Sequence, residues 1–421
     1  MDIKELYKIF CEHTVITTDT RDCPEGSIFF ALKGASFNGN DFALQALEQG
    51  CSYAVVDEAP PGLPQGEERL IVVDDVLTTL QQLARYHREQ LGTPIVGITG
   101  TNGKTTTKEL VATVLAEKYN VHYTRGNFNN HIGVPKTLLQ LTKDHEIAVI
   151  EMGANHPGEI KTLVDIVEPD CGLITNVGRA HLGGFGSFEG VKKTKGELYD
   201  FLVGNDKFAF LNMKDAYLCE MASQRGLKTV PYINGEVVCC NPFVKINIEG
   251  EEIQTKLIGS YNLPNMLAAA TVGRHFGVTN EQIRHALENY TPTNNRSQLT
   301  VTAKNHLVVD AYNANPTSMA AALDNFKAIE ADNKMVILGM MGELGEVSKM
   351  EHEKIVNTLK DYAFADVWLV GSEFAAIEHP FRQFADVEEV KTAIAAEQVQ
   401  GKFILIKGSN SQKLFQLPEL L

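Results

Sequence analysis

The feature that most constrains the fold is a glycine-rich turn between an apolar segment and a helical pattern. The apolar segment is 95–99, and the turn that follows reads Gly100-Thr101-Asn102-Gly103-Lys104-Thr105-Thr106. Glycines let backbone N–H groups face phosphate oxygens, while a helix N-terminus and a lysine add positive charge. A glycine-rich turn without a ligand is the alternative, but it would not require Lys104 followed by three threonines. We therefore predict a strand, a phosphate loop and a helix, although Ile98 stands where the G-x-x-x-x-G-K-S/T pattern has its first glycine.

The length of the chain, 421 residues, exceeds what one hydrophobic core usually supports, so several domains are expected. Gly92 and Pro94 break a helical pattern, and the polar segment 291–295 is typical of a linker. Apolar runs alternate with helical patterns on both sides of these breaks, and three strand-like runs at 236–258 predict a β-rich insertion. The prediction is an α/β fold with a small N-terminal α/β domain (1–91), a central P-loop parallel-sheet domain (92–293) and a C-terminal Rossmann-like domain (294–421).

The net charge of −15 argues against nucleic acid or anionic membranes as partners, because those surfaces attract clustered Lys and Arg. Asp2, Lys4 and Glu5 stand where a signal peptide would be apolar, and we expect no membrane insertion. The seven cysteines are scattered without a metal-binding spacing, which predicts reduced and mostly buried thiols. We therefore expect a cytoplasmic protein.

Seven further segments resemble motifs of the Mur ligase family, as does the phosphate loop TGTNGKTTTK, which also resembles that of folylpolyglutamate synthases. They are Asp19-Thr20-Arg21, Leu32-Lys33-Gly34, residues 127–135, Glu151-Met152-Gly153-Ala154-Asn155, Ala180-His181-Leu182, Lys195-Gly196-Glu197 and Tyr312-Asn313-Ala314-Asn315-Pro316. The resemblance implies a three-domain enzyme that joins D-alanyl-D-alanine to UDP-N-acetylmuramoyl-tripeptide in peptidoglycan precursor synthesis. ATP would phosphorylate the terminal carboxylate of the tripeptide, and the amine of the dipeptide would displace phosphate. We expect the enzyme to be a monomer.

The resemblance also implies which residues bind the nucleotide. ATP would contact the phosphate loop through Gly100, Thr101, Asn102, Gly103, Lys104, Thr105 and Thr106. Asn262 and Asn265 would lie on the adenine side, although Tyr261 replaces a frequent histidine. Arg296 and Asp310 would reach phosphate and ribose. A helix cap is the alternative role for Asp310.

Catalysis and magnesium binding are implied for a second set of residues. Lys104, Glu151, His181 and Lys195 would be catalytic, and Thr105, Glu151, His181 and Lys195 would bind Mg²⁺. Glu151 follows an apolar strand, where parallel sheets bind ligands. Lys195 matches the family position whose amine is carbamylated by CO₂, whereas Lys192 and Lys193 are interpreted as a solvated helix face.

Acceptor substrates are assigned by the same resemblance. Thr20, Arg21, Lys33, Asn127 and Asn130 would form the UDP-muramoyl side, and Asn313 and Asn315 would bind the dipeptide. A plain turn is the alternative for the segment of Asn313 and Asn315. Two positions depart from the family: Met340 stands where Asp is usual, and Asn410 where Arg is frequent.

Three other functions are compatible with the phosphate loop. A Mur ligase that adds the third amino acid is the nearest, but its diaminopimelate form carries a D-N-P-R motif that this sequence lacks. Folylpolyglutamate synthases lack an N-terminal UDP-binding domain of this kind. A non-catalytic sensor of UDP-muramoyl peptides would not need Glu151, His181 and Lys195 together.

Overall fold

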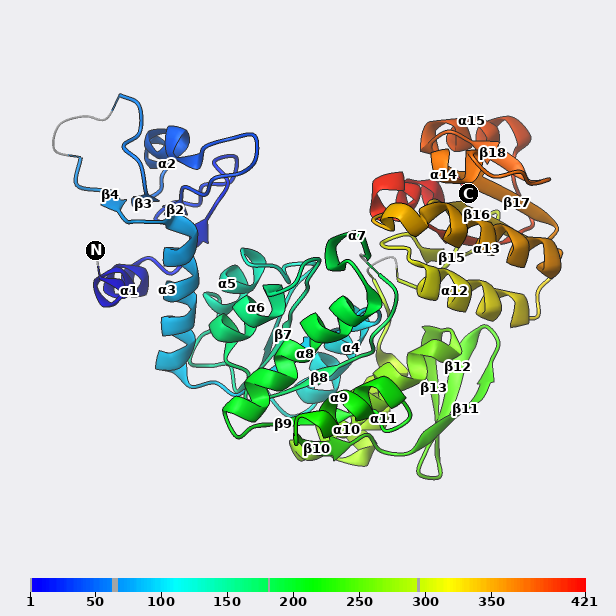
Figure 1. Ribbon diagram of the computed structural model, residues 1–421, viewed down its shortest axis with the longest axis horizontal. Helices are drawn as coiled ribbons and strands as arrows, with labels where there is room; N and C mark the ends of the chain where they lie inside the picture. Colours follow the sequence, from blue (N-terminus) through cyan, green and yellow to red (C-terminus); the bar gives the residue numbers. More distant parts are fainter. Residues whose placement is uncertain (1, 63–66, 181, 294–295) are drawn as a thin grey trace. The chain divides into compact units, whose positions relative to one another are not determined.

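The computed structural model describes residues 2–62, 67–180, 182–293 and 296–421, which group into two compact units. The first unit contains Met1–Gly97, Tyr119–Ala154 and Gly158–Gly172, and the second contains Ile98–Lys118, Asn155–Pro157 and Leu173–Leu421. Both are built largely from parallel strands and helices, which confirms the predicted α/β class (Figure 1).

The N-terminal part of the first unit is a parallel sheet in the order β1-β2-β3-β4. Helix α2 packs small apolar residues, Ala43 and Ala46, against this sheet. Asp75 caps α3 by accepting a hydrogen bond from Thr78 N at 2.6 Å, and Gly92 ends this helix in a left-handed conformation. The elements are α1 (Ile3–Glu12), β1 (Ile16–Thr17), β2 (Ile28–Phe30), η1 (Gly39–Phe42), α2 (Ala43–Glu48), β3 (Tyr53–Val56), β4 (Leu70–Val72) and α3 (Val76–Leu91).

The central sheet has the strand order β10-β9-β8-β5-β7-β6. Strand β5 is buried throughout, as its unbroken apolar sequence predicts. The elements are β5 (Ile95–Thr99), α4 (Lys104–Ala116), β6 (Val121–Tyr123), α5 (Gly133–Leu138), β7 (Ile147–Glu151), α6 (Glu159–Val167), β8 (Cys171–Ile174), α7 (Leu182–Phe185), α8 (Phe188–Gly204), β9 (Phe208–Leu211), α9 (Ala216–Gln224), β10 (Lys228–Pro231), α10 (Leu263–His275) and α11 (Asn280–Asn289).

A separate antiparallel sheet of three strands, β11-β12-β13, precedes α10 and confirms the predicted β-rich insertion (Figure 1). Its strands are β11 (Gly235–Cys240), β12 (Phe243–Ile248) and β13 (Glu251–Ile258), and the short helix η2 (Ser260–Asn262) connects it to α10. Burial alternates along β12, so only one face of the sheet is covered.

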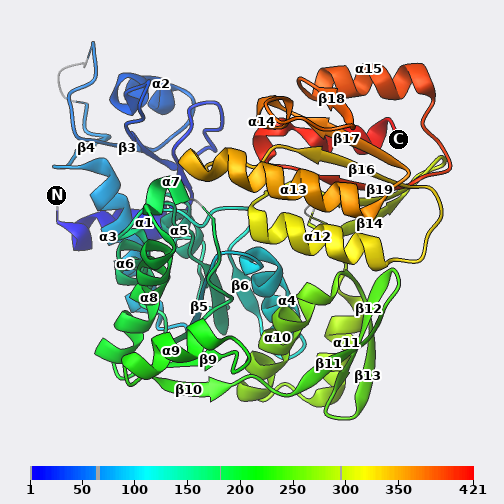
Figure 2. The same ribbon diagram turned by 45° about the vertical axis from the view of Figure 1, so that its right-hand side comes forward.

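The C-terminal sheet has the order β14-β15-β19-β16-β17-β18, with only β14 antiparallel to its neighbour. Figure 2 shows α12 and α13 on one face and α15 on the other. The chain leaves β15 toward the first face and β19 toward the second, so these strands mark a topological switch point. The elements are β14 (Gln298–Val301), β15 (His306–Asp310), α12 (Pro316–Ala328), β16 (Lys334–Gly339), η3 (Gly345–Val347), α13 (Ser348–Tyr362), β17 (Asp366–Val370), α14 (Ser372–Ala375), β18 (Arg382–Phe384), α15 (Val387–Glu397), β19 (Phe403–Lys407), η4 (Asn410–Gln412) and η5 (Leu414–Glu419).

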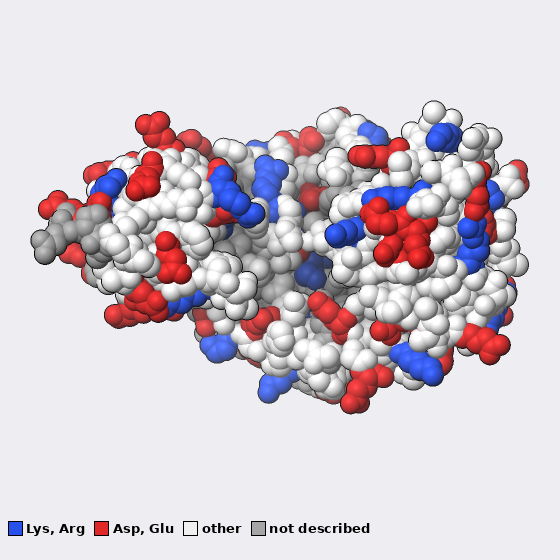
Figure 3. Space-filling model, turned by 90° about the horizontal axis from the view of Figure 1, so that it is seen from above, with Lys and Arg blue, Asp and Glu red and all other residues white. Residues whose placement is uncertain are grey.

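The helices, the charged surface and the cysteines can be compared with what the composition predicts. None of the helices in the described ranges is both long and apolar enough to cross a bilayer. On the face drawn in Figure 3, acidic groups interrupt the basic ones, in keeping with the net charge of −15. The prediction of mostly buried cysteines is wrong: all seven are free thiols, but only Cys51 and Cys171 are buried. The others lie where solvent reaches them: Cys11 and Cys219 on helices, Cys239 and Cys240 on β11, and Cys23 in a loop.

Candidate active site

The phosphate loop, residues 100–106, begins where β5 ends. Ile98 is fully buried inside β5, which accounts for a large apolar residue in place of the usual glycine. Gly100 and Gly103 both have positive φ angles, +143° and +79°. A Cβ atom on Gly100 would overlap the Thr175 hydroxyl, and one on Gly103 would lie 2.7 Å from Asn265 Oδ1. Glycine is therefore required at both positions by conformation and by space.

Residues after β8 hold the phosphate loop from one side. Thr101 N donates to Asn176 O at 3.0 Å, and Thr175 Oγ1 donates to Asn102 O at 2.6 Å. Asn176 also accepts from Asn102 N and donates to Asn102 O, both at 3.0 Å. Strand β8 ends at Ile174 because the residues that follow bond to the loop rather than continue the strand.

Lys104 opens α4 and lies over its own loop. Its Nζ donates to the carbonyl oxygens of Gly100 at 2.9 Å and Thr101 at 3.0 Å. Thr105 is buried in the first helical turn, and Thr106 is partly buried beside it. The arrangement places an ammonium group and the backbone N–H groups of a helix N-terminus around one loop, which is how proteins bind phosphate.

Asn262 and Asn265 are buried and connect α10 to α4. Asn262 Nδ2 donates to Ile258 O, and Asn265 Nδ2 donates to Asn262 Oδ1, each at 2.9 Å. Thr107 Oγ1 donates to Asn265 Oδ1 at 3.0 Å. These asparagines therefore support the helix that carries the phosphate loop.

Glu151 ends β7 as a buried carboxylate in the first unit. Its Oε1 accepts from Asn129 Nδ2 at 2.8 Å, and its backbone N–H donates to Thr124 Oγ1 at 3.0 Å. Asn129 lies in the motif 127–135 but was not among the residues predicted from it. The motif contains three asparagines, at 127, 129 and 130, and nothing in the sequence indicates which of them contacts the Glu151 carboxylate.

The three lysines at the start of α8 differ in their surroundings. Lys193 is exposed, and Lys192 lies 3.3 Å from Glu189 and 3.5 Å from Glu220 in ion pairs. Lys195 is only 2% exposed, and its Nζ lies 5.4 Å from the ring centroid of Phe185. Burial thus distinguishes Lys195 from the exposed Lys193, and the interpretation of Lys192 as solvated is wrong, because its side chain is only 16% exposed.

His181 lies outside the described residues. Among the residues that are described, no three His, Cys, Asp or Glu side chains form a metal-binding group. A lysine carbamate would be an additional anionic donor of a kind that those four residue types do not include.

Asp310 and Lys407 form a pair at the switch point of the C-terminal sheet. The two residues are register partners on β15 and β19, and Lys407 Nζ lies 2.5 Å from Asp310 Oδ2. The same Nζ donates to Asn313 O at 3.2 Å, and Lys407 is 1% exposed. Lys407 was not predicted from the sequence, although a lysine that ends an apolar strand can mark this edge of a parallel sheet.

The segment 312–316 uses its asparagines within the protein. Asn313 Oδ1 accepts from Ala314 N at 2.8 Å. Asn315 caps α12 by accepting from Ser318 N at 2.9 Å, and its Nδ2 donates to Asn102 Oδ1 at 2.7 Å. The guanidinium of Arg296 lies 4.0 Å from the ring centroid of Tyr312, so the two segments meet.

The two positions that depart from the family lie in neighbouring loops. Met340 O accepts a hydrogen bond from Ser409 Oγ at 3.0 Å, and Asn410 follows Ser409 at the start of η4. Met341 N donates to Nε2 of the buried His352 at 2.9 Å. The backbone of both loops is therefore fixed independently of the Met340 and Asn410 side chains.

The residues assigned to the UDP-muramoyl side fall into two sets in the first unit. Arg21 pairs with Asp19 at 2.6 Å and lowers the pKa of that carboxyl to about 2. Thr18 Oγ1 accepts from Lys136 of α5 at 3.4 Å, which brings the segment of Thr20 and Arg21 to the helix that follows Asn127 and Asn130.

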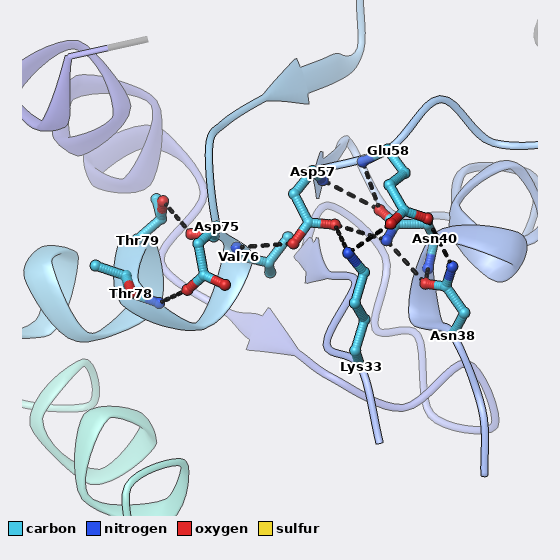
Figure 4. Close-up of polar contacts among 9 residues, drawn as sticks. All are labelled: Lys33, Asn38, Asn40, Asp57, Glu58, Asp75, Val76, Thr78 and Thr79. Carbon is cyan, nitrogen blue, oxygen red and sulfur yellow. Dashed lines mark hydrogen bonds and ion pairs between the residues drawn. The ribbon is translucent and has the colours of Figure 1, made fainter. Parts of the chain in front are cut away.

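Lys33 belongs to a different set of contacts, drawn in Figure 4. Its Nζ lies 2.9 Å from Asp57 Oδ1 and 2.8 Å from Glu58 Oε1. Asn40 donates to Asp57 at 2.8 Å, and Asn38 donates to Glu58 at 2.9 Å. The hydrogen bond to Glu58 and the one to Asp57 raise the pKa of Lys33. The lysine charge is therefore compensated by two carboxylates.

Comparison with known proteins gives three family matches along the chain. Models of the Mur ligase family match residues 12–88 (catalytic domain), 98–273 (middle domain) and 295–410 (glutamate ligase domain). The UDP-N-acetylmuramoyl-tripeptide–D-alanyl-D-alanine ligase of Bacillus subtilis is 34% identical over 96% of this chain and 93% of its own.

Two solved structures are also similar. MurF from Acinetobacter baumannii has a TM-score of 0.86 and 29% identity, covering 99% of this chain and 97% of its own. MurF from Thermotoga maritima in complex with ADP has a TM-score of 0.84 and 26% identity, covering 96% of each chain. The fold, the phosphate loop and these similarities together establish that the chain belongs to the Mur ligase family.

Proposed function

We propose that this chain is an ATP-dependent amide ligase that adds D-alanyl-D-alanine to UDP-N-acetylmuramoyl-tripeptide through an acyl phosphate. The observation that supports this most is the braced phosphate loop around Lys104, in a chain similar over 96% of its length to a ligase of that name. A carboxylate does not form an amide near neutral pH without a better leaving group. Phosphorylation of one carboxylate oxygen supplies that group, and the dipeptide amine then attacks the carbonyl carbon and releases phosphate.

Lys104 and the start of α4 would bind the phosphates of ATP. The ammonium is bonded to neutral carbonyl oxygens, which a phosphate oxygen can replace with a gain in charge attraction. Gly100, Thr101, Asn102, Gly103, Thr105 and Thr106 complete this set. Asn262 and Asn265 are proposed for the adenine side of the nucleotide, and Arg296 and Asp310 for its phosphate and ribose.

Mg²⁺ would be bound by hard oxygen donors, and the residues present fit it. The Thr105 hydroxyl and the Glu151 carboxylate are oxygen donors, and Asn129 holds one oxygen of that carboxylate in place. When bound, the cation would neutralise charge between the ATP phosphate and the substrate carboxylate. His181 stays a proposed further ligand.

Lys195 would serve as a carbamate. Its neutral amine would add CO₂ and lose one proton, converting a cation into an oxygen ligand for Mg²⁺. The support is its burial, since an amine kept from bulk water is protected from competing reactions.

The two acceptor substrates would bind at different domains. Thr20, Arg21, Lys33, Asn127 and Asn130 are proposed for the UDP-muramoyl peptide, and Asn313 and Asn315 for the dipeptide. The boundaries at 91–92 and 293–294, the monomeric state and the cytoplasmic location stay predictions.

Phosphate release from ATP tests the proposal. Release should require both UDP-N-acetylmuramoyl-tripeptide and D-alanyl-D-alanine, and omitting either should reduce it to background. Single amino acids tested with UDP-muramoyl dipeptide provide the comparison. Faster release in that second reaction would overturn the proposal and favour the ligase that adds the third residue.

A further inference from the structure

The phosphate loop is held from a second side by the C-terminal domain. Asn315 Nδ2 donates to Asn102 Oδ1 at 2.7 Å, and Asn102 Nδ2 lies 3.5 Å from Asn315 Oδ1. Asn315 is 5% exposed, so water competes little for this amide pair. The two residues are 213 positions apart, one in the loop after β5 and the other at the start of α12.

The Asn315 side chain and the Asn102 backbone are each held by further hydrogen bonds. The backbone of Asn102 is bonded through its N–H and its carbonyl to Asn176 and Thr175. Asn315 Oδ1 accepts from Ser318 N, and Asn315 N donates to Ser318 Oγ at 3.1 Å. The cap of α12 thus fixes the orientation of the Asn315 amide, and the end of β8 fixes the position of Asn102.

Further contacts show that the same two regions meet over more than one pair. A Cβ atom on Gly178 would lie 3.5 Å from Thr317 Oγ1 in the first turn of α12. Gly183 N donates to Glu343 O at 3.4 Å, and Arg179 lies 3.9 Å from the buried carboxylate of Glu351. The amide pair is the shortest of these contacts and the only one of them made by a residue of the phosphate loop.

We propose that Asn315 and Asn102 form a positioning pair through which the C-terminal domain orders the phosphate loop for ATP. Asn315 would then act on nucleotide affinity without touching the nucleotide, in addition to the dipeptide role assigned to its segment. Binding of ATP and binding of the dipeptide would be linked, because both would act on the phosphate loop. Such linkage is reciprocal, so each ligand would change the affinity for the other by the same factor. The inference rests on the proposed binding of ATP at the phosphate loop.

Calorimetric titration with the unreactive analogue adenosine 5′-(β,γ-imido)triphosphate and Mg²⁺ tests the pair in the full-length protein. Asn315→Ser keeps a side chain that caps α12 but is too short to reach Asn102. We expect this variant to bind the analogue about fivefold more weakly, as loss of one hydrogen bond predicts. The melting temperature should stay within about 2 °C of the wild-type value because the cap is kept.

A double-mutant cycle separates coupling from two independent effects. Asn102→Ala should also weaken binding, and Asn102→Ala with Asn315→Ser should be no weaker than Asn102→Ala alone. Asp386→Ser, which exchanges the cap of α15 on the other face of the sheet, is the matched control and should leave affinity unchanged.

Two results would overturn the pair: unchanged affinity in Asn315→Ser, or fully additive losses in the double variant. The titration contains no acceptor substrate. A wild-type chain that binds the analogue but fails the phosphate-release assay would therefore refute the proposed acceptors and leave the pair testable.

Discussion

Two lysines that the sequence assigned to anionic ligands have different partners in the structure. Lys104 donates to the carbonyl oxygens of Gly100 and Thr101, which are uncharged. Lys33 lies between the carboxylates of Asp57 and Glu58, at 2.9 Å and 2.8 Å. Replacing a carbonyl by a phosphate oxygen adds charge attraction, whereas replacing a carboxylate first breaks an ion pair.

The difference shows that a lysine in a family motif does not by itself define an anion site. Whether a lysine can bind an anionic ligand depends on whether carboxylates of the protein already neutralise its charge. Lys104 donates to two neutral carbonyl oxygens, whereas the cluster around Lys33 contains one cation against two anions. The predictions below measure how far this distinction holds.

The largest effect is expected for Lys195→Ala, in the same unit as the phosphate loop. Loss of a carbamate ligand should lower kcat for ligation by about a thousandfold, the upper range for one electrostatic stabiliser. Formate or acetate should restore part of the activity by supplying the missing anion. Lys193→Ala, on the exposed face of α8, is the control and should keep wild-type activity.

Circular dichroism should show that Lys195→Ala is folded. Full activity of this variant without added acid would mean that Lys195 is not a ligand, whatever its burial.

Lys104→Met should lower kcat/KM for ATP by about a hundredfold, because the ammonium would neutralise charge on the transferred phosphate. The melting temperature should change little, since the Lys104 ammonium bonds to carbonyl oxygens of its own loop. A loss of less than tenfold would show that Lys104 is no more available to the nucleotide than Lys33 is to its substrate.

Asp57→Asn tests the compensated cluster through stability. This exchange keeps the shape of a side chain that is 6% exposed but removes its charge, and should lower the free energy of unfolding by about 1–2 kcal/mol at pH 7. Urea denaturation followed by circular dichroism measures it. Asp41→Asn, on the exposed surface of the same unit, is the control and should leave the midpoint unchanged.

The difference in free energy of unfolding between the wild-type protein and Asp57→Asn should depend on pH in a definite direction. Burial alone would raise the pKa of Asp57, but the hydrogen bonds from Lys33 and Asn40 outweigh burial and lower that pKa. A depressed carboxyl pKa stabilises the fold above the unfolded value of about 3.9, and the stabilisation is lost as pH falls through the folded value. The two proteins should therefore become equally stable below that range. A difference that persists at lower pH would contradict this origin.

The smallest effect is expected for Lys33→Met. Because its charge is shared with two carboxylates, KM for UDP-N-acetylmuramoyl-tripeptide should rise by only about threefold, with kcat unchanged. Initial rates at saturating ATP and dipeptide measure both. A rise of a hundredfold would show that Lys33 leaves its carboxylates for the substrate, and the contrast with Lys104 would fail.

Parts of the fold and the site could be predicted from local pattern. The phosphate loop was predictable because its glycines, lysine and flanking apolar strand are contiguous, and the insertion at β11-β12-β13 because no helical pattern interrupts it. The end of β8 at Ile174 was not predictable. It depends on hydrogen bonds from Thr175 and Asn176 to the phosphate loop, which lies 73 or more positions earlier in the sequence.

Contacts between distant segments carry no local signal. The pairing of Lys407 with Asp310 was missed because the two residues are 97 positions apart and only the strand order β15-β19 brings them together. The bond between Asn102 and Asn315 was missed for the same reason. Burial of Lys195 likewise depends on how α8 packs, and only a resemblance distinguished it from Lys192 and Lys193.

Isotope transfer tests the acyl phosphate most directly. UDP-N-acetylmuramoyl-tripeptide labelled with ¹⁸O in both oxygens of its terminal carboxylate is converted with unlabelled ATP and D-alanyl-D-alanine, and the released phosphate is measured by mass spectrometry. Phosphorylation of the carboxylate predicts one ¹⁸O atom in each phosphate and one in the new amide. Phosphate without label would mean that ATP does not phosphorylate the carboxylate, and would contradict the proposed reaction.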